Sequence, residues 1–125
     1  MKAAIFCSDP RLLREKAREL VGDDEHAIRR LLELIVETNR TTLTSLSEHL
    51  QAARWEGVGS AAHRIAGSAR MLGCDALIAL LTDLEAAARA QNSELATALL
   101  PVLTDALASI DRSIAHALAF TRAAQ

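Results

Sequence analysis

The sequence predicts an all-α protein, an up-down-up-down antiparallel four-helix bundle with an extra N-terminal helix that caps one end. Half of the residues are hydrophobic but only 2% are aromatic, a composition that favours helix over strand. Apolar residues recur at three- and four-residue spacing, as in amphipathic helices. Helix-start and helix-stop residues punctuate the chain, and its 125 residues fit a single domain over residues 1–125.

The first two predicted helices are delimited by cap residues. Asp9 followed by Pro10 is a helix start, because an aspartate caps the first turn and proline has no N–H to lose there. This helix ends by Gly22. The second predicted helix runs from near Asp23 to near Ala53, and its apolar stripe consists of Ile28, Leu31, Leu32, Ile35, Leu43, Leu46 and Leu50.

The third and fourth predicted helices are separated by a glycine. The third runs from about Arg54 to Leu72 and stops at Gly73, the residue type favoured just past a helix C-terminus. The fourth follows from about Asp75. Its apolar stripe consists of Leu77, Leu80, Leu81 and Leu84.

The fifth predicted helix is long and contains a proline. Ser93 is its expected N-cap, and its apolar stripe runs for many turns through Leu95, Leu99, Val102, Leu103, Ala106, Leu107, Ile110, Ile114 and Leu118. Pro101 interrupts this stripe. We expect a bend there within one helix, because an interior proline removes a backbone hydrogen bond and clashes with the preceding turn. The short connections between helices imply antiparallel neighbours.

The third predicted helix carries an unusual polar face. At about 100° per residue its buried stripe is predicted to be Val58, Ala61, Ile65, Ala69 and Leu72. His63 points the other way and shares its side with Gly59, Ala66, Gly67 and Arg70. A helical glycine costs about 1 kcal/mol relative to alanine, so Gly67, one turn after His63, indicates that space beside the imidazole is needed.

These residues resemble the motif of the histidine-containing phosphotransfer (HPt) domain. That motif has a histidine, any residue, an aliphatic residue, often a lysine, a glycine and a small residue, followed by Leu-Gly and a later Leu-Glu. Here the matching residues are His63, Arg64, Ile65, Ala66, Gly67 and Ser68, then Leu72 with Gly73, and Leu84 with Glu85. The resemblance covers nearly the whole chain, and it is greatest to the C-terminal HPt modules of tripartite hybrid sensor kinases.

The resemblance implies a phosphorelay module. His63 would accept a phosphoryl group from a receiver-domain aspartate and pass it to a response-regulator receiver aspartate. Imidazole offers a nucleophilic nitrogen near neutral pH, and phosphoryl transfer depends mainly on positioning and charge neutralisation. The implied partners are therefore the receiver domains of a hybrid kinase and of a response regulator. The implied Mg²⁺ belongs to the receiver, so that this domain needs no cofactor or metal. No autonomous kinase activity is expected, because the chain lacks a glycine-rich nucleotide loop and the His-Glu-x-x-x-Pro type signature of a kinase dimerisation helix.

One position departs from the family pattern. Many members carry a phosphate-contacting lysine three residues after the histidine, where this chain has Ala66. Arg70, two turns from His63 on the same predicted face, is the natural substitute because a guanidinium suits phosphate oxygens. Arg64 is a weaker candidate. Together with Gly67, Ala66 and Gly59, these arginines form the predicted phosphoryl-contacting or partner-docking set.

Charge and composition exclude other partners. The formal net charge of −2 and the lack of a basic run argue against nucleic acid. We expect no direct membrane contact, because no apolar run looks long enough to span a bilayer. Cys7 and Cys74 have neither metal-ligand spacing nor the pattern of a disulfide framework, so a cytoplasmic location is expected. The chain could also be the cytoplasmic module of a membrane-bound sensor kinase.

Two other functions stay open. The chain could be a pseudo-HPt bundle that docks partners without being phosphorylated, and phosphoryl acceptance separates that function from the relay. A ligand-binding or metal-binding bundle is the weakest alternative, because the inward-facing Glu and Glu-x-x-His sets of such bundles are not found. His26, His49 and His116 show no mutual spacing that would build a site and are predicted to be surface residues. Cys74 is expected to pack as a small apolar residue.

Overall fold

The computed structural model describes residues 9–123, with side chains to residue 119, and this part of the chain is entirely helical. The predicted all-α class is thus confirmed. Five helices follow one another in the described residues: α1 (Pro10–Val21), α2 (Glu25–Gln51), α3 (Trp55–Leu72), α4 (Asp75–Arg89) and α5 (Ser93–Ala123).

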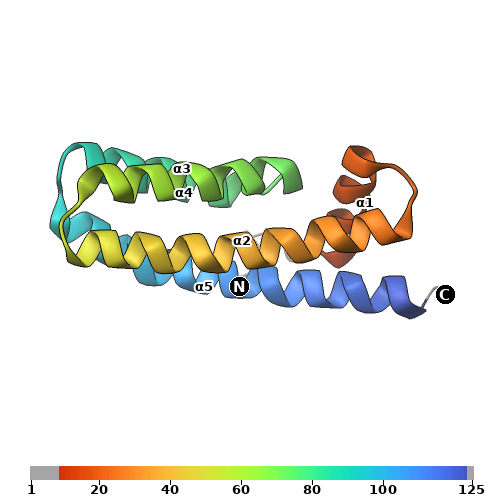
Figure 1. The fold of residues 1–125 in the computed structure, drawn as a ribbon. Helices are drawn as coiled ribbons and strands as arrows, with labels where there is room; N and C mark the ends of the chain where they lie inside the picture. The colour runs from red at the N-terminus through yellow and green to blue at the C-terminus, as the bar shows by residue number, and fades with distance from the viewer. Residues whose placement is uncertain (1–8, 124–125) are drawn as a thin grey trace.

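Helices α2 to α5 lie side by side along their lengths (Figure 1). Helix α3 packs against α2 and α4, and α5 packs against the same two helices. Helices α2 and α5 are the longest, and α1 lies beside the part of them that extends past the end of α3 and α4 (Figure 1). Helix α1 also contacts α2, α3 and α5, so it covers one end of the bundle.

A single aliphatic core joins all five helices. Its largest fully buried side chains are Leu13, Ile28, Leu32, Leu46, Ile65, Leu72, Leu77, Leu81, Leu84, Leu103, Ile110 and Ile114. Each such side chain contributes about 1.5–3 kcal/mol of burial free energy. The contribution of α3 includes four buried alanines, Ala61, Ala62, Ala66 and Ala69, whose small side chains allow close helix packing. Helix α3 is therefore held firmly on several sides.

The helix ends follow ordinary capping chemistry. A side-chain oxygen of Asp24 accepts hydrogen bonds from the N–H groups of His26 and Ala27 at 2.9 and 3.4 Å, which caps α2. Gly73 ends α3 with a left-handed φ of 71°, as predicted. Helix α5 differs from the prediction, because the side chain of Asn92 accepts from the N–H of Leu95 at 3.1 Å. Asn92 is therefore the capping residue and Ser93 the first helical one.

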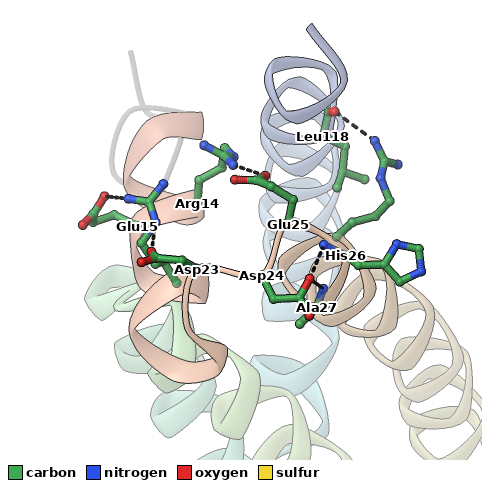
Figure 2. A network of polar contacts seen from close by, with 10 residues as sticks. Arg14, Glu15, Asp23, Asp24, Glu25, His26, Ala27 and Leu118 are labelled. Atoms are coloured by element: carbon green, nitrogen blue, oxygen red, sulfur yellow. Dashed lines mark hydrogen bonds and ion pairs between the residues drawn. The ribbon is translucent and has the colours of Figure 1, made fainter. Parts of the chain in front are cut away.

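Ion pairs and a hydrogen bond fix α1 and α5 to the start of α2 (Figure 2). Arg14 of α1 pairs with Glu25 of α2. The guanidinium of Arg29, on α2, donates to the backbone carbonyl of Leu118 on α5 at 3.2 Å. These contacts link segments far apart in the sequence at the end of the bundle where α1 lies.

Helix α5 continues through Pro101 as one helix, as the sequence predicted; the bend expected there stays a prediction. By length and composition its stretch Ser93–Ala119 could cross a membrane, although no apolar run of that length was expected from the sequence. One such helix is weak evidence, because the core helix of a soluble protein has the same properties. Here Leu103, Ile110 and Ile114 of this stretch are buried in the core.

Cys74, between α3 and α4, is only 1% exposed. It is nonetheless disulfide-bonded and not simply a small apolar side chain. The cysteine spacing indicated no disulfide framework, and that expectation fails at Cys74; Cys7 lies outside the described residues. Spacing alone could not reveal this, because a disulfide needs proximity in the fold and not in the sequence.

Candidate functional site

The imidazole of His63 stands on the outer surface of α3, near the middle of the helix. Its side chain is 70% exposed. Ile65, Ala69 and Leu72 are buried on the opposite side, as predicted. Because those buried residues fix the rotation of α3, the histidine is presented to solvent from a rigid element.

The outward strip of α3 is not quite the one that the helical wheel predicted. Ala66 is only 1% exposed and belongs to the core, whereas Gly59 is half-buried and Arg70 is exposed. The prediction that Ala66 lies beside His63 on the surface is therefore wrong. Helices α2 and α4 flank α3 on two sides, and an angle calculated from sequence cannot show which of its residues they cover.

A carboxylate accompanies the histidine. The Nδ1 atom of His63 lies 3.7 Å from the Oε2 atom of Glu85 on α4, and the Glu85 side chain is only 23% exposed. This distance exceeds a hydrogen bond and is that of an ion pair once the ring is protonated. Glu85 lies beside Nδ1, and the other ring nitrogen, Nε2, has no partner among the described residues. Nε2 is therefore the nitrogen that is available to react.

Sequence reasoning did not assign Glu85 to the site. The signal was present, because Leu84 and Glu85 match the family's later Leu-Glu pair. The helical periodicity of α4 shows which of its residues face the core, but not that Glu85 reaches a residue of α3. Only the packing of α4 beside α3 brings the two side chains together.

A groove between α2 and α3 opens on one side of His63. Its volume is about 330 Å³, and we call it the α2–α3 groove; it is lined by Leu31, Leu34, Ile35, Thr38, Arg64, Gly67, Ser68 and Met71. A Cβ atom placed on Gly67 would meet nothing within 4 Å, so this glycine leaves open space as predicted. Leu34 and Met71 are each 40% exposed, which gives the groove an apolar surface.

A second cavity lies between α3 and α4 on the other side. We call it the α3–α4 pocket; its volume is about 370 Å³, and it is lined by Trp55, Glu56, Gly59, Ser60, Glu85, Ala88, Arg89 and Gln91. The structure thus separates the predicted docking residues. Arg64 and Gly67 line the α2–α3 groove, whereas Gly59 lines the α3–α4 pocket together with Glu85.

The two candidate arginines carry unneutralised charge. Arg64 and Arg70 are both exposed, and neither forms an ion pair within the described part of the chain. Arg70 lines neither of these two cavities. Among the described residues no three His, Cys, Asp or Glu side chains gather closely enough to hold a metal ion.

A buried polar contact supports the groove from beneath. The Ser68 hydroxyl lies 2.9 Å from both the side-chain oxygen of Asn39 on α2 and the carbonyl oxygen of Ile65. Ser68 and Asn39 are 7% and 4% exposed. A buried hydrogen bond fixes one helix register, because an unpaired partner would cost about 1–3 kcal/mol. The spacing between α2 and α3 at Gly67 is set in this way.

Of the three other histidines, His26 and His116 are exposed as predicted, and His49 is not simply a surface residue. Its Nδ1 atom accepts a hydrogen bond from Arg54 Nε at 3.0 Å. A Cβ atom on Gly57 would lie 2.4 Å from the His49 ring, so the ring occupies the space that this glycine leaves. The hydrogen bond between His49 and Arg54 stabilises the turn between α2 and α3. The His49 ring also explains Gly57, a helical glycine to which the sequence analysis assigned no role.

Comparison with known proteins decides the family. The family model described as "Hpt domain" matches residues 30–113, which include α3, α4 and most of α2. The chain belongs to the Hpt domain family. The match contains His63, Glu85 and both cavities, so the site lies within the part of the chain that defines an Hpt domain.

The Hpt domain is similar to a small part of a much longer type of protein. It is 39% identical over 77 residues, 62% of this chain, to the virulence sensor protein BvgS of Bordetella pertussis. The BvgS proteins of Bordetella parapertussis and Bordetella bronchiseptica match to the same extent. The aligned part is 6% of each relative's length. No solved structure matches this Hpt domain significantly.

Proposed function

We propose that this Hpt domain is a phosphorelay intermediate that takes a phosphoryl group from a receiver-domain aspartate onto His63 and passes it to a response-regulator receiver aspartate. The observation that carries the proposal is the His63 ring, 70% exposed on a helix held by the core, with Glu85 3.7 Å from Nδ1. Membership of the Hpt domain family supports a role in two-component signalling. The transfer partners and the direction are our proposal.

The chemistry follows from the two ring nitrogens. Nε2 of His63 attacks the phosphorus atom of the aspartyl phosphate, so that a P–N bond forms while the P–O bond to the aspartate breaks. The departing carboxylate takes the bonding electron pair. The ring, protonated at Nδ1, then carries positive charge, which the Glu85 carboxylate offsets at short range. The second transfer is the same displacement, with the acceptor aspartate as nucleophile and His63 as leaving group.

The receiver supplies the rest of the machinery in this proposal. Charge on the transferred phosphoryl oxygens is neutralised by Mg²⁺ bound to the receiver, and the Hpt domain brings no cofactor of its own. Arg70 takes the place of the lysine that many family members carry at the position of Ala66. Its support is an exposed guanidinium with no ion pair among the described residues, on the outer strip of the same helix as His63.

The domain acts as a transfer intermediate without kinase activity of its own, on the up-down-up-down bundle predicted from the sequence. Its similarity to the virulence sensor protein BvgS supports a hybrid sensor kinase as the source of one receiver. A cytoplasmic location is proposed on that similarity alone. The cysteines no longer favour it, because Cys74 is disulfide-bonded and disulfides are rare in a reducing cytoplasm.

The deciding experiment is transfer of radiolabelled phosphate from a phosphorylated receiver domain to the chain. We expect label that is lost in acid and retained in base, which identifies phosphohistidine, followed by transfer to a second receiver. A wild-type chain that binds cognate receivers but takes up no label would overturn the relay and establish the pseudo-HPt docking function.

A further inference from the structure

The two cavities beside His63 differ in charge. In the α2–α3 groove the only ionisable side chain is Arg64, and Leu31, Leu34, Ile35 and Met71 make its surface largely apolar. The α3–α4 pocket has two carboxylates, Glu56 and Glu85, one guanidinium, Arg89, and the indole of Trp55. A partner that covers His63 therefore meets an apolar surface on one side and a polar, net negative one on the other.

The charges of the α3–α4 pocket are available to a partner. Glu56 comes from α3 and Glu85 from α4, so the carboxylates are held on two packed helices. Glu56 and Arg89 are exposed, and neither forms an ion pair with another described residue. Among the described residues, the ion pair that Glu85 forms is with the imidazole of His63, which is charged only when protonated.

The remaining wall of the pocket favours a cation with an apolar stem. Trp55 is half-buried against the core, and a tryptophan ring attracts ammonium and especially guanidinium groups. Gly59 and Ala88 leave the wall between α3 and α4 low, because one has no side chain and the other only a methyl group. A Cβ on Gly59 would be in ordinary van der Waals contact with the Ala88 Cβ, at 3.9 Å. The two carboxylates outnumber the single guanidinium of Arg89, so the pocket keeps a net negative charge. Together with the ring and the low wall, this charge matches the methylene stem and charged end of arginine or lysine.

We propose that the α3–α4 pocket receives an arginine or lysine side chain of the docked partner. That the partner is a receiver domain rests on the proposed function; that the pocket takes a cationic side chain does not. Glu85 lines the pocket and also pairs with His63. A cation bound in the pocket therefore interacts with the same carboxylate as the imidazole. Docking thereby changes the electrostatic environment of the ring that transfers the phosphoryl group.

The sole tryptophan of the chain provides the test, because Trp55 lines the pocket. The full chain is titrated with N-acetyl-arginine amide while the fluorescence of Trp55 is recorded. N-acetyl-citrulline amide, which has nearly the same shape but no charge, is the matched ligand. We expect a saturable change with the arginine compound only. A citrulline titration that matches the arginine one, or no saturable change with arginine, would overturn the proposal.

Variants locate the binding. Glu56→Gln should weaken arginine binding by about threefold, the size expected from one partly screened charge pair. Glu37→Gln, an exposed carboxylate on α2 outside the pocket, is the matched control and should leave binding unchanged. Equal weakening by both variants would show a general charge effect and contradict the pocket assignment.

A nuclear magnetic resonance measurement tests the link to His63. The ring resonances of His63 should shift during the arginine titration, whereas those of His116, exposed on α5, should not. His63 resonances that stay constant while Trp55 responds would refute the sharing of Glu85. None of these measurements involves phosphate, so that failure here is distinguishable from failure of phosphoryl transfer.

Discussion

The Nδ1 atom of His63 on α3 lies 3.7 Å from Oε2 of Glu85 on α4, which pairs a 70% exposed ring with a carboxylate that is only 23% exposed. The carboxylate is therefore the better fixed of the two groups. It can orient the ring and balance its positive charge, while Nε2 has no partner among the described residues. The reactive ring lies on the exposed side of α3, and the side chains that stabilise the fold lie on its buried side. Substitutions can therefore test the two roles separately.

Replacing His63 with Gln should abolish phosphoryl acceptance and leave the fold intact. Exposed side chains away from the core usually change stability by no more than about 0.5 kcal/mol. Receiver-dependent labelling and the urea midpoint of unfolding measure the two effects. His116→Gln, at an exposed site on α5, is the matched control and should label normally. Undiminished labelling of His63→Gln would disprove the assignment of the phosphoacceptor.

Replacing Glu85 with Gln should slow transfer without stopping it. The amide keeps the shape of the side chain but cannot balance charge on the ring, so we expect a loss on the order of tenfold in transfer rate, or about 1.4 kcal/mol. Rapid-quench measurement of single-turnover transfer gives the rate. Asp83→Asn, exposed on the same helix, is the control. If both variants transfer at the wild-type rate, Glu85 has no part in the reaction.

Replacing Arg70 with Ala should reduce the transfer rate or shorten the phosphohistidine lifetime while receiver docking is retained. The physical reason is the loss of a guanidinium that offsets charge on the phosphoryl oxygens. Titration calorimetry with the receiver gives the affinity, and loss of label with time gives the lifetime. Arg64→Ala, the weaker candidate, should affect both less. A larger effect of Arg64 on transfer would reverse the assignment of the two arginines.

Replacing Gly67 with Leu should preserve folding but block docking. A Cβ at this position meets nothing within 4 Å, so the helix accepts a side chain, and the leucine then fills the α2–α3 groove. Gly67→Ala separates the two effects, because it should stabilise α3 by about 0.5–1 kcal/mol and intrude far less. Thermal unfolding and receiver affinity are the measurements. Normal receiver affinity of Gly67→Leu would show that the groove is not used.

Replacing Asp111 with Asn should raise stability at pH 7. Burial raises the pKa of the Asp111 carboxyl above its ordinary 3.8, and the nearby Arg40 lowers it by a smaller amount. A raised folded-state pKa means that the folded protein binds more protons, so this group's contribution to stability falls as the pH rises from about 3.8 through the folded-state pKa. Urea unfolding at pH 3 and pH 7 checks this. A variant less stable than wild type at pH 7 would show that the ion pair with Arg40 dominates.

The sequence predicted the helices well because their ends depend on local chemistry. Asp9 with Pro10, and Gly73, mark helix boundaries where the structure has them. Local rules failed where two residues compete for one role. Asn92 caps α5 in place of the expected Ser93, because its side chain reaches the N–H of Leu95.

The sequence by itself determined the all-helical class, most helix boundaries and the exposure of His63 opposite Ile65, because capping and periodicity act within one helix. Only the tertiary structure decided what lies beside the histidine. It buried Ala66, brought Glu85 from α4 to within 3.7 Å of the ring, and assigned Gly67 and Gly59 to different cavities. The physical reason is that helical spacing gives the direction of each side chain but not which neighbouring helix covers it. The covering helix depends on how α2 and α4 pack against α3 and against α5.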